Sequence, residues 1–265
     1  MQITVSAGLA VSLDGNMSLE SIAQADQALY LAKDRGRNRL CTWPMVQLSQ
    51  IVDELRFSAE AGIETRLEAL VARCEPELGV TQRDHLTAHS WAVADFAVML
   101  GEAIGLDHKV LNDLRLAGLL HDVGKLFIPE TVLAKPGPLS AEERCLIDRH
   151  AADGAWLGEM LGAGRGVTEY VRYHHTPAHK LIRQMEEDAY PSPGARVLAV
   201  ADAFVTMTNE RPYRAACTAS GAVWELRRCG RTRFDQTMVQ AIPRAVVARS
   251  RCGPARRWLV PVECG

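Results

Sequence analysis

The sequence predicts a mainly α-helical protein with a short α/β segment at its N-terminus. From residue 81 onward, hydrophobic residues recur with helical spacing and no stretch alternates as a strand does. Residues 3–11, by contrast, are typical of a β-strand, and a turn follows at residues 14–16. We therefore expect an α/β segment at 1–43, a connecting helix at 44–78, a helical domain at 79–250 and a tail at 251–265.

The N-terminal segment has the pattern of a strand, a helix and a second strand. Ser18 is placed to cap the N-terminus of the helix and Gly36 to end it, and residues 39–43 form the second short strand. Two strands do not make an independently stable sheet. The segment is therefore typical of the end of a larger α/β domain.

The connecting helix is predicted from hydrophobic residues at helical spacing over residues 48–71, with an interruption near Gly62. Its hydrophobic stripe either pairs with a second copy of the chain, giving a homodimer, or packs against a neighbouring helix. The pattern does not separate these two interpretations.

Seven helices are expected in the helical domain. A loop rich in Pro and Gly at residues 135–138 precedes one of them, and Ser140 and Glu143 have the spacing of a capping box at its start. The expected helices are 85–104, 109–121, 140–161, 166–175, 195–208, 219–228 and 235–248.

Composition excludes several classes of partner and location. The net charge is −2 and the pI is near 6.5, so duplex nucleic acid is not an expected partner. The seven cysteines form no C-x-x-C pair, which indicates neither a disulfide framework nor a structural zinc site. No apolar run is long enough to span a membrane, so we do not expect the protein to associate with a membrane. We expect a cytoplasmic protein.

The strongest functional signal is a series of metal-type ligands along the middle of the chain. Imidazole suits several transition metals and a carboxylate can bridge two cations, so these groups suffice for a binuclear site. Lys125 lies one helical turn after His121, where its ammonium can meet a phosphate oxygen. The ligands are His89, His121, Asp122, His150, His174, His175 and Asp202.

The N-terminal segment resembles the C-terminal quarter of GGDEF domains, the diguanylate cyclases. The resemblance is carried by residues 5–10, 25–33 and 36–39. That family's signature turn and nucleotide loop would lie upstream of residue 1, so we do not expect cyclase activity. The segment is interpreted as a truncated fragment or a consequence of an internal start at Met1; the alternative is a residual dimerisation or docking role, with a GGDEF protein as the partner.

Residues 81–239 resemble the HD superfamily of metal-dependent phosphohydrolases, and specifically its HD-GYP branch, the cyclic di-GMP phosphodiesterases. The resemblance implies an HD-domain helical bundle that hydrolyses cyclic di-GMP to the linear dinucleotide pGpG or to GMP. It is carried by Thr87–Ser90, Gly118–Lys125, Leu133–Leu139, Arg196–Phe204, Arg211–Arg214 and Arg233–Asp235, the last being similar to the family's Gln-Phe-Asp motif.

The resemblance also implies roles for individual residues. One divalent ion would be held by His89, His121, Asp122 and Asp202, and Asp122 would bridge to a second ion held by His150, His174 and His175. Fe or Mn is expected. Lys125 would stabilise charge in the transition state.

Three further residues have two interpretations each. Arg211 and Arg214 are either phosphate clamps or structural arginines beside a Pro-Tyr turn. His85 lies one helical turn before His89 and is either a ligand for a third metal or a surface residue.

The chain departs from the family pattern after His175, where the family normally has Glu-Arg-Trp-Asp-Gly-x-Gly-Tyr-Pro. Residues 176–191 contain no glycine here, and Lys180–Asp188 is typical of a polar helix. The sequence therefore does not decide which substrate the site accepts. Cyclic di-GMP is the first expectation, and the alternatives are another nucleotide or a non-catalytic module that binds metal or nucleotide.

Overall fold

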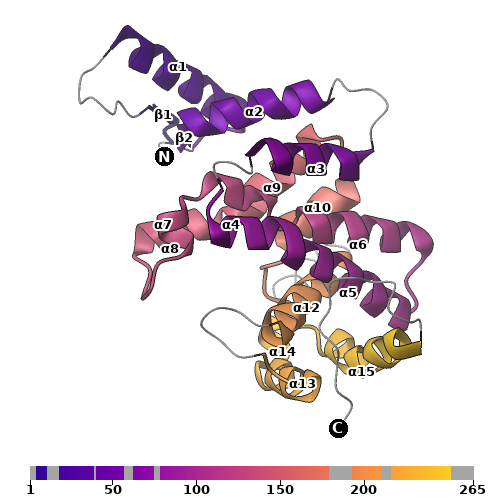
Figure 1. Ribbon diagram of the computed structural model, residues 1–265. Coiled ribbons are helices and arrows are strands. Elements are labelled where there is room, and N and C mark those ends of the chain that lie inside the picture. Colours follow the sequence, from indigo (N-terminus) through magenta and orange to yellow (C-terminus); the bar gives the residue numbers. More distant parts are fainter. Residues whose placement is uncertain are drawn as a thin grey trace. The chain divides into compact units, whose positions relative to one another are not determined.

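The computed structural model of the chain describes residues 4–10, 18–38, 40–56, 62–74, 78–178, 193–209 and 216–251. The chain divides into two compact units, Met1–Glu60 and Ala61–Gly265. Figure 1 shows that helices dominate and that the strands occur near the N-terminus. The predicted fold class, mainly helical with a small α/β part, is confirmed. The predicted boundaries at 43, 78 and 250 stay predictions.

The first unit is a small β-α-β arrangement followed by a helix. Strands β1 (Ala7–Leu9) and β2 (Leu40–Thr42) pair in parallel, with Gly8 opposite Cys41, and α1 (Leu19–Asp34) connects them. A Cβ at Gly8 would lie 2.1 Å from the Ala25 carbonyl oxygen, so α1 packs directly on the β1 backbone. Helix α2 (Trp43–Arg56) follows β2.

The ends of α1 follow the predicted caps. The Ser18 side chain accepts a hydrogen bond from the backbone N–H of Ser21 at 3.1 Å. After Arg35, Gly36 adopts a φ of +97°, a conformation that favours glycine and that turns the chain out of the helix.

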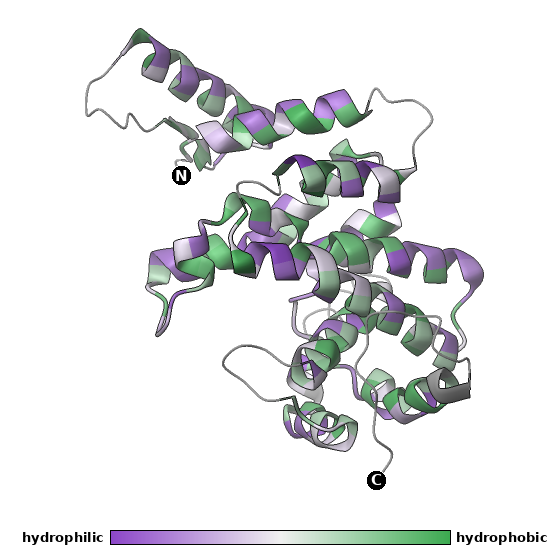
Figure 2. Cartoon of the chain, viewed as in Figure 1, coloured by the Kyte–Doolittle hydropathy of each residue, from purple (hydrophilic) through white to green (hydrophobic). Residues whose placement is uncertain are grey.

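The second unit, called the helical unit below, contains only helices among its described residues. Figure 2 shows hydrophobic and hydrophilic residues along α6, as expected for a helix with one face in the core. Its elements are α3 (Ile63–Cys74), α4 (Val80–Asp84), η2 (His85–His89), α5 (Ser90–Ala103), α6 (His108–Leu120), η3 (Val123–Phe127), α7 (Glu130–Leu133), α8 (Ala141–Asp148), α9 (His150–Met160), α10 (Arg165–Tyr173), α12 (Pro193–Thr208), α13 (Ala219–Arg228), α14 (Gly230–Arg233) and α15 (Gln236–Arg251).

Helix α5 is the centre of the helical unit and packs against α6, α12 and α15. Phe96 of α5 stacks on Phe204 of α12 with ring centroids 4.4 Å apart. A Cβ at Gly118 would lie 2.4 Å from the Ala94 Cα, so this glycine lets α6 approach the α5 backbone. Close packing of α5 with α6 and α12 brings the ends of several helices to one region of the unit.

Two predicted helices differ from the structure. The helix expected at 85–104 starts earlier, at Val80, and contains a π-helical turn, η2, at His85–His89. The Ser90 hydroxyl donates to the His85 carbonyl oxygen, five residues back, at 2.5 Å and so satisfies an acceptor within the wider turn. The helix expected at 140–161 is divided into α8 and α9, with Arg149 between them at φ −74° and ψ −19°.

Side-chain caps start α6 and α8 of the helical unit, the latter at the predicted capping box. Asp107 accepts from the backbone N–H of Val110 at 2.9 Å at the start of α6. Ser140 and Glu143 form the predicted capping box at the start of α8. The polar helix expected at 180–188 lies outside the described residues. Among the helices that the structure describes, none combines the length and the apolar character needed to span a membrane.

Candidate functional site

The seven predicted metal ligands lie together, at or beside the ends of four elements and within a fifth. His89 closes the π-turn η2, His121 and Asp122 follow the last residue of α6, and His150 opens α9. His174 and His175 follow α10, and Asp202 lies within α12. Helix ends can hold side chains rigidly at one point because the helices themselves are fixed by packing in the core.

Three of the histidines are oriented by the same backbone interaction. The Nδ1 atoms of His121, His150 and His174 lie 2.8, 2.6 and 2.6 Å from the carbonyl oxygens of the residues three positions earlier. A carbonyl oxygen can only accept, so each Nδ1 carries the hydrogen and each Nε2 keeps its lone pair. In the neutral form, all three imidazoles therefore present an Nε2 lone pair.

Two of these Nε2 atoms fit a bound cation. The Nε2 atoms of His121 and His174 are buried and have no hydrogen-bond partner among the described residues. A buried polar atom without a partner is costly and needs an explanation. A divalent ion would provide one, because a neutral imidazole nitrogen is a common metal ligand.

One ligand group consists of His150, His174 and His175, whose potential ligand atoms lie within 4.8 Å of one another. The Nε2 atoms of His150 and His175 are 3.2 Å apart. Two nitrogens that coordinate the same ion at about 2.1 Å lie roughly 3 Å apart, so this spacing suits a shared cation. His150 and His174 are buried, whereas His175 is exposed at the edge of the group.

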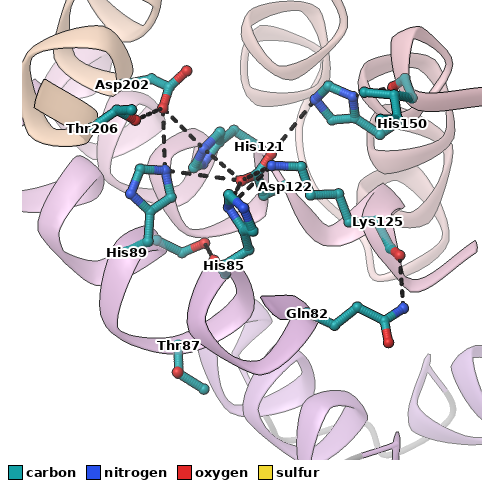
Figure 3. A network of polar contacts seen from close by, with 12 residues as sticks. Gln82, His85, Thr87, His89, His121, Asp122, Lys125, His150, Asp202 and Thr206 are labelled. Atoms are coloured by element: carbon teal, nitrogen blue, oxygen red, sulfur yellow. Dashed lines mark hydrogen bonds and ion pairs between the residues drawn. The ribbon is translucent and has the colours of Figure 1, made fainter. Parts of the chain in front are cut away.

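A second ligand group consists of His89, His121 and Asp202. The Asp202 Oδ1 atom lies 3.1 Å from His89 Nε2 and 3.9 Å from His121 Nε2. Thr206, one helical turn after Asp202, donates to the same oxygen at 3.2 Å. The hydroxyl thereby orients the carboxylate toward the histidines (Figure 3).

Asp122 lies between His121 and His150, which belong to different groups, as Figure 3 shows. Its Oδ1 is 3.5 Å from His150 Nε2 and its Oδ2 is 3.4 Å from His121 Nε2. The two oxygens of one carboxylate thus face histidines of different groups, the arrangement required of a ligand that bridges two ions.

His85 is not a surface residue, because it is buried and its Nδ1 lies 2.8 Å from Asp122 Oδ2. His85, His89 and Asp122 form a third group of potential ligands. Within the π-turn the two imidazoles lie on the same side, with centroids 5.3 Å apart. The extra-ligand interpretation of His85 is therefore compatible with its position.

Lys125 is turned toward the carboxylate. Its Nζ lies 2.6 Å from Asp122 Oδ2 and 3.0 Å from His85 Nδ1. The Lys125 ammonium thus balances the negative charge of the Asp122 carboxylate. A cation held by His85, His89 and Asp122 would compete with this ammonium for the same atoms.

Burial and neighbouring charges shift the pKa values in opposite directions. Burial lowers the pKa of His150 to about 4 and holds the pKa of His174 well below its ordinary value. Burial alone would lower the pKa of His121 and raise that of Asp122. Burial is the largest single cause for both groups, but their neighbours together outweigh it. Asp122 and Asp202 raise the pKa of His121. His121, Lys125 and His85 hold the pKa of Asp122 well below its usual range.

We predict that the metal-free protein loses stability as the pH falls from 7 toward 5. The pKa of His150 is 6.5 before folding and about 4 in the folded chain, so the unfolded state binds more protons in this interval. The pKa of His174 is shifted the same way and that of His121 the opposite way. His150 alone would lower the free energy of unfolding by about 2 kcal/mol between pH 7 and 5, measured by urea unfolding in the presence of a chelator.

The matched control for this prediction is the exposed His108. His108→Gln should keep the full pH dependence, and His150→Gln should reduce it. Equal free energies of unfolding for the unsubstituted chain at pH 7 and pH 5 would contradict the assignment of a buried neutral imidazole.

Two residues that support the site were not found from the sequence. Thr206 orients Asp202, and its position one turn further along a helix is the signal that could have indicated it. Gln82 donates from Nε2 to the carbonyl oxygen of Lys125 at 3.1 Å (Figure 3). It also donates to the carbonyl oxygen of Ile128 at 2.9 Å and so fixes the segment after Asp122. No local pattern indicates this contact. Arg211 and Arg214 lie outside the described residues.

Comparison with known proteins agrees with this geometry. Residues 67–238 match the model of the HD domain family. The chain is 34% identical over 148 residues to 3'3'-cGAMP-specific phosphodiesterase 1 of Vibrio cholerae, covering 54% of this chain and 34% of that protein. It is 29% identical over 175 residues to a cyclic di-GMP phosphodiesterase of Pseudomonas aeruginosa, covering 63% and 40%. The chain thus spans between a third and two fifths of the length of these relatives.

The fold is also similar to a solved structure, described as an HDG"Y"P protein from Bdellovibrio bacteriovorus. The TM-score is 0.51 at 15% identity, and the match covers 89% of this chain and 75% of that one. At this identity the similarity concerns the fold alone. Since the family model covers most of the chain, the protein belongs to the HD domain family and is related to the cyclic dinucleotide phosphodiesterases of that family.

Proposed function

We propose that the chain hydrolyses a phosphodiester bond of a cyclic dinucleotide. The observation that carries this proposal is the position of Asp122, whose two oxygens face histidines of two separate ligand groups. The curated relatives named above act on 3'3'-cGAMP or cyclic di-GMP, which supports a cyclic dinucleotide as the substrate class. Cyclic di-GMP, opened to pGpG and then to GMP, is the specific substrate that we propose.

The residues divide into two proposed ligand sets that share Asp122. His89, His121 and Asp202 would hold one divalent ion, and His150, His174 and His175 the other, with Fe or Mn as the proposed metals. When bound, two such ions supply Lewis acidity toward a phosphoryl group and lower the pKa of water. His85 is a proposed additional ligand.

The other side chains would orient ligands and balance charge. Thr206 holds the Asp202 carboxylate, and the carbonyl oxygens before His121, His150 and His174 hold their imidazoles in the tautomer that exposes Nε2. Lys125 carries an ammonium within 2.6 Å of Asp122. We propose that it moves to the phosphoryl oxygens when substrate binds and neutralises charge that develops there. Arg211 and Arg214 remain proposed phosphate contacts.

Turnover assays on a panel of phosphodiesters test the proposal. The protein is loaded with Fe(II) or Mn(II) and incubated with cyclic di-GMP, 3'3'-cGAMP and bis(4-nitrophenyl) phosphate. Chromatography should detect the linear dinucleotide or GMP, and a chelator should abolish its formation. Tight calorimetric binding of cyclic di-GMP without product over hours would favour a non-catalytic binding module, and hydrolysis of other esters alone would overturn the substrate.

The proposals for the remaining parts of the chain rest on sequence. We propose that residues 1–43 are the end of a GGDEF-type domain, and that the connecting segment at residues 44–78 contributes to a homodimer.

A further inference from the structure

Three of the predicted metal ligands line one wall of a cleft whose second wall, opposite it, comes from other helices. This cleft has a volume of about 360 Å³ and includes His174, His175 and Asp202 on one side. Its other side is formed by α13, α14 and the residue after α14, through Glu225, Cys229, Arg233 and Phe234. A cleft of this size is typical of a site for a small ligand. The second wall contains none of the predicted metal ligands.

Arg233 contributes a free positive charge to the second wall. Its side chain is exposed, and its guanidinium lies 5.5 Å from the centre of the Phe234 ring. No described carboxylate lies within ion-pair distance of it. The Glu225 carboxylate on the same wall is already bound by Arg228, through two hydrogen bonds of 2.9 and 2.7 Å. The second wall therefore offers an anion the Arg233 guanidinium with its donors available.

The backbone around Arg233 is held on both sides. Gly230, with a φ of +69°, turns the chain out of α13 and into the short helix α14. Asp235, two residues after Arg233, forms a short ion pair with Arg196 of α12, and both side chains are largely buried. Because α12 also carries Asp202, one helix positions both a proposed metal ligand and the second wall.

We infer that Arg233 binds the phosphate of the substrate that is not being hydrolysed; this inference rests on the proposed function. A cyclic dinucleotide contains two phosphodiesters joined in one ring. When one phosphate lies at the ligand groups around Asp122, the other must lie elsewhere in the cleft with its negative charge. A guanidinium matches a phosphate through two parallel charge-assisted hydrogen bonds. This contact recognises a phosphate of the sugar–phosphate ring, so it does not depend on which bases the cyclic dinucleotide carries.

Arg233→Gln tests this inference, because it removes the charge while keeping a polar side chain that can donate a hydrogen bond. The KM for cyclic di-GMP or 3'3'-cGAMP should rise about ten- to one-hundredfold with little change in kcat, as expected for the loss of a charge-assisted contact. The inhibition constant of the linear dinucleotide pGpG, measured against hydrolysis of bis(4-nitrophenyl) phosphate, should rise by a similar factor. Hydrolysis of bis(4-nitrophenyl) phosphate, which has one phosphate, should keep its kcat/KM.

The matched control is Arg227→Gln, since Arg227 is an exposed arginine of α13 that does not line the cleft. This variant should behave as the unsubstituted enzyme. If Arg233→Gln leaves the KM for the cyclic dinucleotide and the affinity for pGpG unchanged, the inference is overturned. An equal loss on the cyclic dinucleotide and on bis(4-nitrophenyl) phosphate would also overturn it. Failure of the proposed function is distinct, because the unsubstituted enzyme would then not turn over cyclic dinucleotides.

Discussion

Asp122→Ala is expected to reduce turnover at least about a thousandfold and to remove at least half of the bound metal. The carboxylate is 3.4 Å from His121 Nε2 and 3.5 Å from His150 Nε2, so its removal takes a ligand from both groups at once. It also leaves the Lys125 ammonium beside His85 without its counter-charge. Elemental analysis of the purified variant measures the metal separately from activity.

Asp148→Ala is the matched control, because Asp148 is an exposed aspartate that belongs to none of the ligand groups. It should retain metal and turnover. Circular dichroism must show that Asp122→Ala is folded, and Asp122→Asn provides a variant of nearly unchanged volume. Full metal content in a folded Asp122→Ala protein would refute the shared-ligand assignment, whatever its activity.

Gly124→Ala should destabilise the helical unit by about 3 kcal/mol or more, the upper range for adding volume to a packed site. A Cβ at this position would lie 2.0 Å from the His150 carbonyl oxygen and 2.6 Å from the Gly154 backbone nitrogen. Both obstacles are backbone atoms, so α9 must move as a whole. Because His150 opens α9, the displacement also moves a proposed metal ligand.

Thermal unfolding measures this effect, and a lowering of Tm of roughly 6–12 °C is expected for a unit of this size. Gly164→Ala is the control, because nothing lies within 4 Å of a Cβ there and its φ is −66°. That variant should change Tm little. A Gly124→Ala protein with an unchanged Tm would show that η3 and α9 are not packed as closely as described.

The sequence predicted most helices and their starts because both signals are local. The hydrophobic face of a helix recurs every three or four residues, and a cap such as Ser18, Asp107 or Ser140 bonds to a backbone N–H within the next turn. The π-turn at His85–His89 and the break at Arg149 were not predicted from these local signals. Neither changes the spacing of hydrophobic residues enough to be recognised.

The candidate ligands could be listed from the sequence because few residue types bind metals and they accompanied a recognisable family pattern. Their grouping could not be obtained in this way. Asp122 was expected as a bridge only from resemblance, and the position of its two oxygens between two histidine groups is a tertiary result. The same holds for His85, for which burial removed the surface interpretation.

The sequence by itself thus determined a mainly helical chain, its capped helix starts and a set of imidazole and carboxylate groups suited to divalent ions. Only the tertiary structure decided which of these groups face one another, that Lys125 contacts Asp122, and that Arg233 shares a cleft with Asp202. The physical reason is the range of the interactions. Helix formation and capping depend on neighbours within a turn or two, whereas the site and the second wall depend on contacts between helices far apart in sequence, which packing around α5 creates.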